Sequence, residues 1–146
     1  MKPKLKQAYM ATAKVFAELS HARRLHVGAI VVKDDRIISI GYNGMPAGWD
    51  NDCEEEIYQQ DGTTGLKTRP EVLHAESNAI AKLAKSNDSG LGADLFVTHS
   101  PCLECSKLIF QSGIGRVYYN ENYRDDDGIK FLKTSGITVE QINVQS

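Results

Sequence analysis

Two short motifs, far apart in the sequence, place the strongest constraint on how this chain can fold. One is His74-Ala75-Glu76 and the other is Pro101-Cys102-Leu103-Glu104-Cys105. A zinc ion accepts imidazole nitrogen and thiolate sulfur, and three protein ligands with a fourth position left to water are typical of a catalytic zinc site. We therefore predict that His74, Cys102 and Cys105 bind one zinc ion together.

The residue types around this site indicate hydrolytic chemistry. Glu76 lies two positions from His74, where it is more useful as a proton carrier than as a fourth ligand. The pattern H-x-E followed by P-C-x-x-C occurs in zinc deaminases, in which the glutamate is the general acid and base. We expect Glu76 to move protons while ammonia leaves an amidine-like ring carbon.

Both motifs are predicted to begin a helix. Proline is tolerated in the first turn of a helix, so Pro101 favours a helix that starts near Cys102. Cys102 and Cys105 are three residues apart and would then share one helix face. The positive ends of two helix dipoles would favour the thiolate form that binds metal.

Other interpretations of the motifs remain open at this point. A C-x-x-C alone is also found in structural zinc sites and in redox pairs. A structural zinc would need a fourth ligand, for which Cys53 and His99 are the candidates. We expect Cys53 to be an unpaired thiol, and His21 and His26 to be surface or packing residues.

Length and charge exclude several classes of function. The chain has 146 residues, which is the size of one domain, so we predict a single domain over 1–146. There are 17 Lys and Arg against 19 Asp and Glu, and the net charge of −2 provides no basic field for duplex DNA or long RNA. The N-terminus lacks a signal-like apolar stretch, so we expect a cytoplasmic protein without a membrane partner, in the host cytoplasm if it is phage-encoded.

The rest of the sequence predicts an α/β domain. Apolar residues recur at helical intervals over 4–20, with Leu5, Tyr9, Thr12, Val15, Phe16 and Leu19 on the apolar side. Strands are expected over 27–33 and 36–42 around the turn Asp34-Asp35, then over 95–98, 116–119 and 137–142. Helices are expected from Ala75, after Pro101 and over 128–134, whereas 44–73 has no strong periodicity. The result is a mixed sheet of about five strands with helices packed on it.

Beyond the zinc motifs, the sequence resembles the deoxycytidylate (dCMP) deaminases. The resemblance lies in residues 70–80 (PEVLHAESNAI) and 97–105 (VTHSPCLEC), and extends to 27–29 (VGA) and 41–48 (GYNGMPAG). The segment 70–72 is similar to phage members in particular. The resemblance implies a three-layer α/β/α cytidine-deaminase-like fold and conversion of dCMP to dUMP for thymidylate supply. It also implies a homohexamer that dCTP activates and dTTP inhibits, with Mg²⁺ accompanying the effector.

The resemblance also implies roles for single residues. Asn43 matches a position that contacts the sugar, and Tyr123 matches a tyrosine that contacts the substrate phosphate. Ala75 and Ser100 flank the base. The effector site implied by the resemblance comprises Arg24, Gly44, Met45, Pro46 and Lys85.

One departure from the family concerns a second zinc. Some relatives carry a structural zinc whose ligands align with Ala22 and Arg69 of this chain, so we expect one zinc per subunit. The alternatives are deamination of dCTP, of a nucleoside or of a base in a nucleic acid, and a zinc module without activity. An assay for released ammonia separates them.

Overall fold

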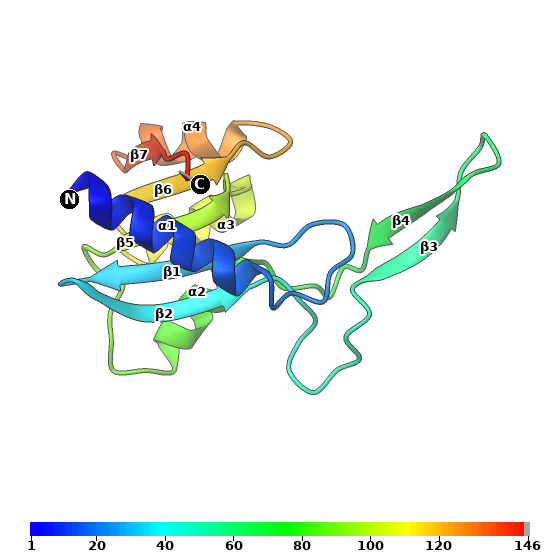
Figure 1. Ribbon diagram of the computed structural model, residues 1–146, viewed down its shortest axis with the longest axis horizontal. Coiled ribbons are helices and arrows are strands. Elements are labelled where there is room, and N and C mark those ends of the chain that lie inside the picture. Colours follow the sequence, from blue (N-terminus) through cyan, green and yellow to red (C-terminus); the bar gives the residue numbers. More distant parts are fainter. Residues whose placement is uncertain (145–146) are drawn as a thin grey trace.

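A mixed β-sheet with helices on both faces forms the body of the molecule in the computed structural model, which describes residues 1–144 (Figure 1). The last two positions of the domain predicted over 1–146 lie outside the described residues. The elements, in chain order, are α1 (Pro3–Ala17), β1 (Gly28–Lys33), β2 (Arg36–Tyr42), β3 (Glu54–Tyr58), β4 (Thr64–Thr68), α2 (Ala75–Ala84), β5 (Asp94–His99), α3 (Leu103–Gln111), β6 (Arg116–Glu121), α4 (Asp127–Thr134) and β7 (Thr138–Gln141).

The central sheet has five strands in the order β2-β1-β5-β6-β7. β1 is antiparallel to β2 and to β5, whereas β6 is parallel to both β5 and β7. The hairpin of β1 and β2 turns at Asp34 and Asp35, whose φ angles of 52° and 59° are those of a two-residue hairpin turn. The predicted mixed five-stranded sheet is confirmed.

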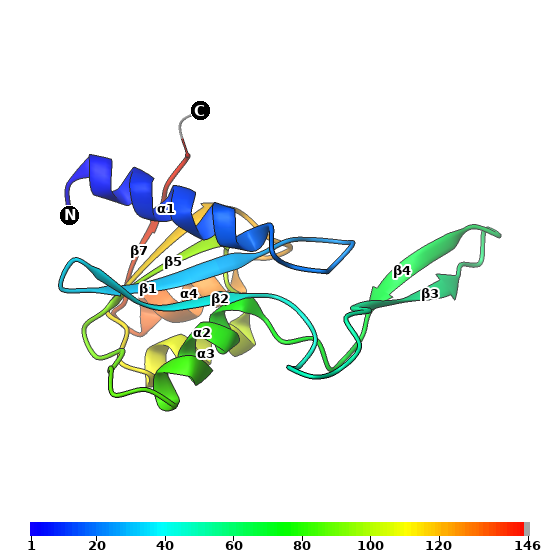
Figure 2. The same ribbon diagram turned by 60° about the horizontal axis from the view of Figure 1, so that its bottom comes forward.

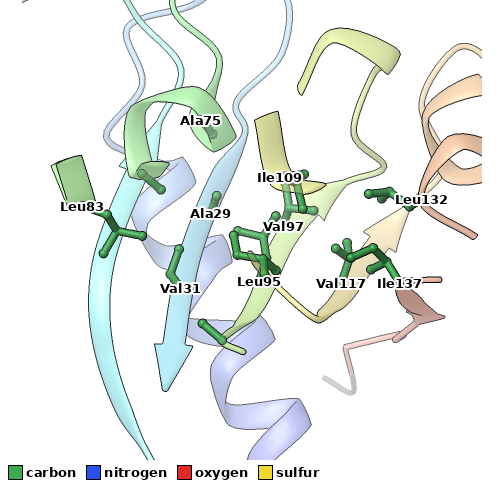
Figure 3. Close-up of a cluster of buried hydrophobic side chains, with 13 residues drawn as sticks. Ala29, Val31, Ala75, Leu83, Leu95, Val97, Ile109, Val117, Leu132 and Ile137 are labelled. Atoms are coloured by element: carbon green, nitrogen blue, oxygen red, sulfur yellow. The ribbon is translucent and has the colours of Figure 1, made fainter. Parts of the chain in front are cut away.

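Alternating side chains of the strands fill two apolar layers, as the period of a β-strand requires. Ala29, Val31, Leu95 and Val97 point to the face that α2, α3 and α4 cover, where they form the core drawn in Figure 3. Ile30, Val32 and Phe96 point to the opposite face, beneath α1. The three-layer α/β/α architecture expected from the sequence is therefore confirmed (Figure 2).

The buried side of α1 differs from the side predicted by its apolar spacing. Val15 and Leu19 were expected to face the core, but they are 67% and 53% exposed. The residues of this helix that are buried are Met10, Ala13 and Ala17. Gly28 of β1 explains the difference, because a Cβ atom there would lie 2.8 Å from the backbone nitrogen of Ala17. Where the helix approaches the strand this closely, it presents the small residues Ala13 and Ala17.

A second, separate hairpin lies in the stretch 44–73, where the sequence predicted no element. β3 and β4 pair antiparallel, from Glu54 opposite Thr68 to Tyr58 opposite Thr64. Figures 1 and 2 show this hairpin, which we call the arm, extending away from the sheet and the helices. Tyr58 near the end of the arm is 90% exposed, whereas Glu54 at its base is buried. The arm therefore has a solvated end and a base that belongs to the body of the protein.

Within residues 1–144, no helix combines the length and the apolar character that crossing a membrane requires.

Candidate active site

The two sequence motifs meet where two helices begin. His74 is the N-cap residue of α2 and Cys102 is the N-cap residue of α3, so the prediction that each motif opens a helix is confirmed. An isolated β-bridge between Gly44 and Leu73 fixes the chain just before His74. The start of a helix carries a partial positive charge, and at the start of α3 the backbone N–H of Cys105 donates to Cys102 Sγ, so both helix starts favour thiolate sulfur here.

The three predicted zinc ligands lie together. His74 Nδ1 is 3.3 Å from Cys105 Sγ and 3.6 Å from Cys102 Sγ, and all three ligand atoms lie within 4.8 Å of one another. Usual Zn–S and Zn–N bond lengths in a tetrahedral site put sulfur and nitrogen about 3.6 Å apart. The spacing and the donor types of these residues therefore fit a zinc ion.

The two residues considered as a fourth ligand are engaged elsewhere. Cys53 Sγ lies 3.6 Å from the carbonyl oxygen of Asn51, and His99 Nε2 lies 3.1 Å from a carboxylate oxygen of Glu121. Among the described residues, the group of His, Cys and acidic side chains suited to a metal contains His74, Cys102 and Cys105 alone. Three ligands with an open fourth position are the arrangement of a catalytic zinc.

The two thiols differ in acidity when no metal is bound. Hydrogen bonds from Cys105 and from His74 lower the pKa of Cys102 to about 4. The pKa of Cys105 is raised, because its thiol donates to Cys102 and because it is buried. A zinc ion requires both sulfurs as thiolates, so metal binding should release a proton and strengthen as the pH rises.

Glu76 is a buried carboxyl group next to the metal ligands. Its side chain is 4% exposed, and burial raises its pKa to about 7, from an ordinary value of 4.5. A general acid and base works best when its pKa lies near the working pH, because both protonation states are then accessible. The environment of Glu76 thus suits a group that must accept a proton and then return it.

Because the pKa of Glu76 is raised, its ionisation should lower the free energy of unfolding of the metal-free protein in a pH-dependent way. Between pH 4.5 and about 7, the folded state holds a proton on Glu76 that the unfolded state has lost, so ionisation of Glu76 destabilises the fold as pH rises. The penalty is fully developed above the folded pKa and amounts to about 3 kcal/mol. Metal-free Glu76→Gln, which avoids this penalty, should unfold at higher urea concentration than the parent at about pH 8 and not at about pH 5. An equal difference at both values would contradict the assignment.

One cavity is lined by two of the three predicted metal ligands and by the residues expected to bind substrate. Asn43, Ala75, Ser100 and Tyr123 all line it, together with His74, Glu76 and Cys102. The hydroxyl oxygen of Ser100 accepts the backbone N–H of Tyr123 at 2.8 Å, which ties the loop after β6 to the end of β5. The structure therefore brings the four candidate substrate residues into the same cavity.

The residues expected in an effector site are distributed differently. Arg24 lines the cavity that contains Glu76. Lys85 is the C-cap of α2, about 16 Å along the helix from His74 at the rise of about 1.5 Å per residue of an α-helix. Gly44 is bonded to Leu73, and the carbonyl of Pro46 accepts the N–H of Trp49, so 44–46 lie in a turn before the arm. Burial raises the pKa of the Cys53 thiol, and the backbone of Met45, in the same turn, partly opposes this.

Sequence reasoning missed several residues in the wall of the cavity. Arg124, Thr68 and Glu54 line it, although none of them carries a motif. The guanidinium carbon of Arg124 lies 5.2 Å from the centroid of the Tyr123 ring, which is the distance of a cation–π contact. The only signal for Arg124 was its position beside Tyr123, and the acidic run around Glu54 resembled a solvated surface.

The combined fold and site define a class of protein. Zinc-dependent deaminases hold their metal with one histidine and two cysteines, and their glutamate moves protons without binding the metal. The same division of roles fits the residues of this cavity, so the class is that of a zinc deaminase domain.

Comparisons with known proteins agree with this class. The family model described as the cytidine and deoxycytidylate deaminase zinc-binding region matches residues 3–121. The ComE operon protein 2 of Bacillus subtilis is 38% identical over 139 residues, which cover 94% of this chain and 71% of that protein. The deoxycytidylate deaminase of Mycobacterium phage D29 is 38% identical over 125 residues, which cover 81% of this chain and 95% of the phage protein.

The fold is similar to that of a solved phage enzyme. The dCMP deaminase of cyanophage S-TIM5, crystallised in complex with dCMP and dUMP, superposes with a TM-score of 0.87 at 49% sequence identity. The match covers 97% of this chain and 99% of the cyanophage chain. This chain belongs to the cytidine and deoxycytidylate deaminase family.

Proposed function

We propose that this protein converts dCMP and water into dUMP and ammonia. One observation carries the proposal: a single cavity is lined by His74 and Cys102, two members of the group suited to a metal, by the buried carboxyl of Glu76, and by two arginines. The metal-suited group and Glu76 are appropriate for hydrolytic removal of an amino group from a ring, and the two arginines are appropriate for binding a phosphate. The similarity to an enzyme crystallised with dCMP and dUMP supports this choice of substrate.

The chemistry of the reaction assigns a task to Glu76. Zinc, when it is bound by His74, Cys102 and Cys105, supplies a water-derived nucleophile at neutral pH. The carboxylate of Glu76 accepts the proton that this water loses and delivers it to the ring nitrogen of the cytosine. Glu76 then takes the proton of the hydroxyl group that the ring carbon has gained and passes it to the amino group, which leaves as ammonia while the carbonyl forms, so a pKa of about 7 serves both steps.

The cations of the cavity suit a nucleotide better than a nucleoside. Arg24 Nη1 donates to the hydroxyl of Thr68 at 3.1 Å, and a guanidinium has five N–H groups, so this bond leaves Arg24 able to bind a phosphate. Arg124 stacks on Tyr123, whose predicted role is contact with the substrate phosphate. The net charge of the chain is −2, so the two arginines are a local feature of the cavity and not part of an overall basic surface.

The remaining predicted contacts concern the sugar and the base. The side chain of Asn43 accepts the N–H of Val27 at 2.9 Å and donates to the carbonyl of Leu25 at 2.8 Å. An amide has two acceptor sites and two donors, so each end of Asn43 retains capacity for a sugar hydroxyl. Ala75 and Ser100 stay our candidates for flanking the base.

An ammonia-release assay tests the function. We expect zinc-loaded protein to deaminate dCMP with a kcat/KM about 100-fold above that for deoxycytidine, since charged hydrogen bonds to the phosphate contribute to the first reaction alone. CMP and dCTP serve as further substrates. The rate of ammonia release from dCTP decides whether the enzyme acts on the monophosphate or, as the alternative holds, on the triphosphate.

Two outcomes would contradict the proposal. The absence of ammonia from every cytosine nucleotide would favour a zinc module without activity. Equal rates on deoxycytidine and dCMP would remove the phosphate from recognition and favour a nucleoside deaminase. An oligonucleotide substrate extends the same assay to deamination of a base in a nucleic acid.

Metal stoichiometry and regulation stay predictions. One zinc per subunit is expected, because Ala22 offers no ligand and Arg69 lies 3.5 Å from the carboxylate of Asp52. Activation by dCTP, inhibition by dTTP, Mg²⁺ at the effector and a homohexamer follow from the family resemblance. Repeating the dCMP assay with each nucleotide, with and without Mg²⁺, tests the effector predictions, and sedimentation tests the hexamer.

A further inference from the structure

Glu54 is a buried acidic residue to which the zinc chemistry gives no role. It is the first residue of the arm and is 1% exposed, whereas its neighbours Glu55 and Glu56 in the same strand are exposed. Burying a carboxylate costs free energy unless hydrogen bonds replace its water shell. The groups that bond to Glu54 therefore indicate what it holds in place.

The partners of Glu54 belong to the segment that joins α1 to β1. The backbone N–H of Arg23 donates to both carboxylate oxygens, at 2.6 Å and 3.0 Å, and the N–H of Arg24 approaches one of them at 3.4 Å. The Arg23 side chain adds a charged contact, with Nε 3.7 Å from Glu54 Oε2. Successive backbone N–H groups that point at one anion form an anion-binding nest. Glu54 thus fixes the backbone from which the Arg24 side chain extends.

The opposite strand of the arm holds the other end of Arg24. Thr68 pairs with Glu54 across the arm, and its hydroxyl accepts from the Arg24 guanidinium at 3.1 Å. Glu54, Thr68 and Arg24 all line the cavity that contains Glu76. The base of the arm therefore fixes Arg24 at both its backbone and its side chain.

The end of the α1–β1 connection that lies next to β1 is held by a different side chain. Asn43 bonds to the backbone of Leu25 and Val27, one to three residues beyond Arg24. This support lies on the β1 side of Arg24, whereas Glu54 supports the α1 side. Loss of Glu54 would therefore release Arg24 while Asn43 still holds the start of β1.

We propose that Glu54 is a positioning residue that holds Arg24 in the cavity for the 5′-phosphate of the substrate. The inference rests on the proposed function, in which Arg24 binds that phosphate. Glu54 itself touches neither the phosphate nor the reacting ring carbon. Its effect on the reaction is exerted through the arginine, and it should therefore depend on whether the substrate carries a phosphate.

Glu54→Gln is the variant that tests this role, because it keeps the size of the side chain. One carboxylate oxygen is replaced by an NH₂ group, which would face the backbone N–H of Arg23 with no acceptor to offer. We expect kcat/KM for dCMP to fall about tenfold, mainly through a higher KM, as a hydrogen-bonded contact to a charged group is lost. The kcat/KM for deoxycytidine, which has no phosphate, should stay within about twofold of the parent.

Glu55→Gln is the matched control, since it makes the same change of charge one residue further along β3, on an exposed side chain. It should leave both substrates unaffected. A second test uses Arg24→Ala. If Glu54 acts through Arg24, then Glu54→Gln should cause no further loss in an Arg24→Ala background, although it does so in the parent.

Several results would overturn the inference. An equal loss on dCMP and deoxycytidine, or additive losses in the double variant, would mean that Glu54 has a general structural role. If Glu54→Gln does not fold, Thr68→Val decides, because it removes the side-chain contact to Arg24 and leaves the buried carboxylate in place. An unchanged preference for dCMP in Thr68→Val would then refute the inference. A parent enzyme without preference for dCMP refutes the proposed function instead, and the inference falls with it.

Discussion

Glu76→Gln is expected to lower kcat for dCMP by about 10²- to 10⁴-fold while zinc content stays at the parental level. The amide keeps the shape of the carboxyl group but can neither accept the proton of a water molecule nor return it. The predicted metal ligands are His74, Cys102 and Cys105, so the change should leave the donor set intact. Ammonia release measures kcat, and metal analysis of the purified protein measures the zinc content.

Glu104→Gln provides the matched control for this experiment. Glu104 lies between the two cysteines in the sequence, but its side chain is 79% exposed and pairs with Lys107 at 3.2 Å. Its replacement should leave the turnover of dCMP unchanged. Turnover by Glu76→Gln near the parental rate would show that another group carries the protons.

Gly41→Ala is expected to impair both the stability and the activity of the protein. A Cβ atom on Gly41 would meet the carbonyl oxygen of Ala75 well inside van der Waals contact and would lie 2.7 Å from the backbone nitrogen of Ala79. Both contacts are with the backbone of α2, so β2 and the helix must separate. Overpacking of this kind costs about 1–3 kcal/mol of folding free energy.

The loss of activity should exceed what stability alone explains. The first turn of α2 follows His74 and contains Glu76, so a displaced helix would shift the predicted zinc ligand and the predicted proton carrier together. A misplacement of about 1 Å at reacting groups can reduce the rate about 100-fold. Urea denaturation gives the stability, and kcat/KM for dCMP at a temperature where the variant is folded gives the effect on the site.

The matched control is Gly115→Ala, which makes the same substitution in a roomier position. The nearest atom to a Cβ on Gly115 is the Cα of Gly92 at 3.9 Å, an ordinary contact distance. Stability and activity should both stay near those of the parent. If Gly41→Ala behaves like this control, then β2 and α2 can adapt to each other without moving the site.

The grouping of His74, Cys102 and Cys105 was predictable from the sequence because these residues lie in two motifs with short spacings. His74 and Glu76 are two residues apart, Cys102 and Cys105 are three apart, and each pair takes its geometry from the start of one helix. The strands of the central sheet were predictable for a related reason. Their side chains alternate between two apolar layers, so the apolar pattern records the buried faces of the sheet.

The arm was not predictable from the sequence, because it has no buried apolar face to produce an alternating pattern. Apart from Glu54, every residue of β3 is exposed, and β4 has no fully buried residue. A hairpin with no buried face need not alternate between apolar and polar residues. The role of Glu54 was equally hidden, since its partners are the backbone N–H groups of Arg23 and Arg24, about thirty residues earlier in the chain.

The two ends of the arm differ in how much change they can accept. At the tip, the N–H of Gln59 bonds to the carbonyl of Thr63, and Gly62 has a positive φ of 84°. Exposed turns of small and polar residues accept inserted segments more readily than any other part of a fold. A peptide tag or a fluorescent label placed between Asp61 and Gly62 would lengthen the arm and leave the pairing of Glu54 with Thr68 intact. The protein can thus be immobilised or labelled there without disturbing its cavity.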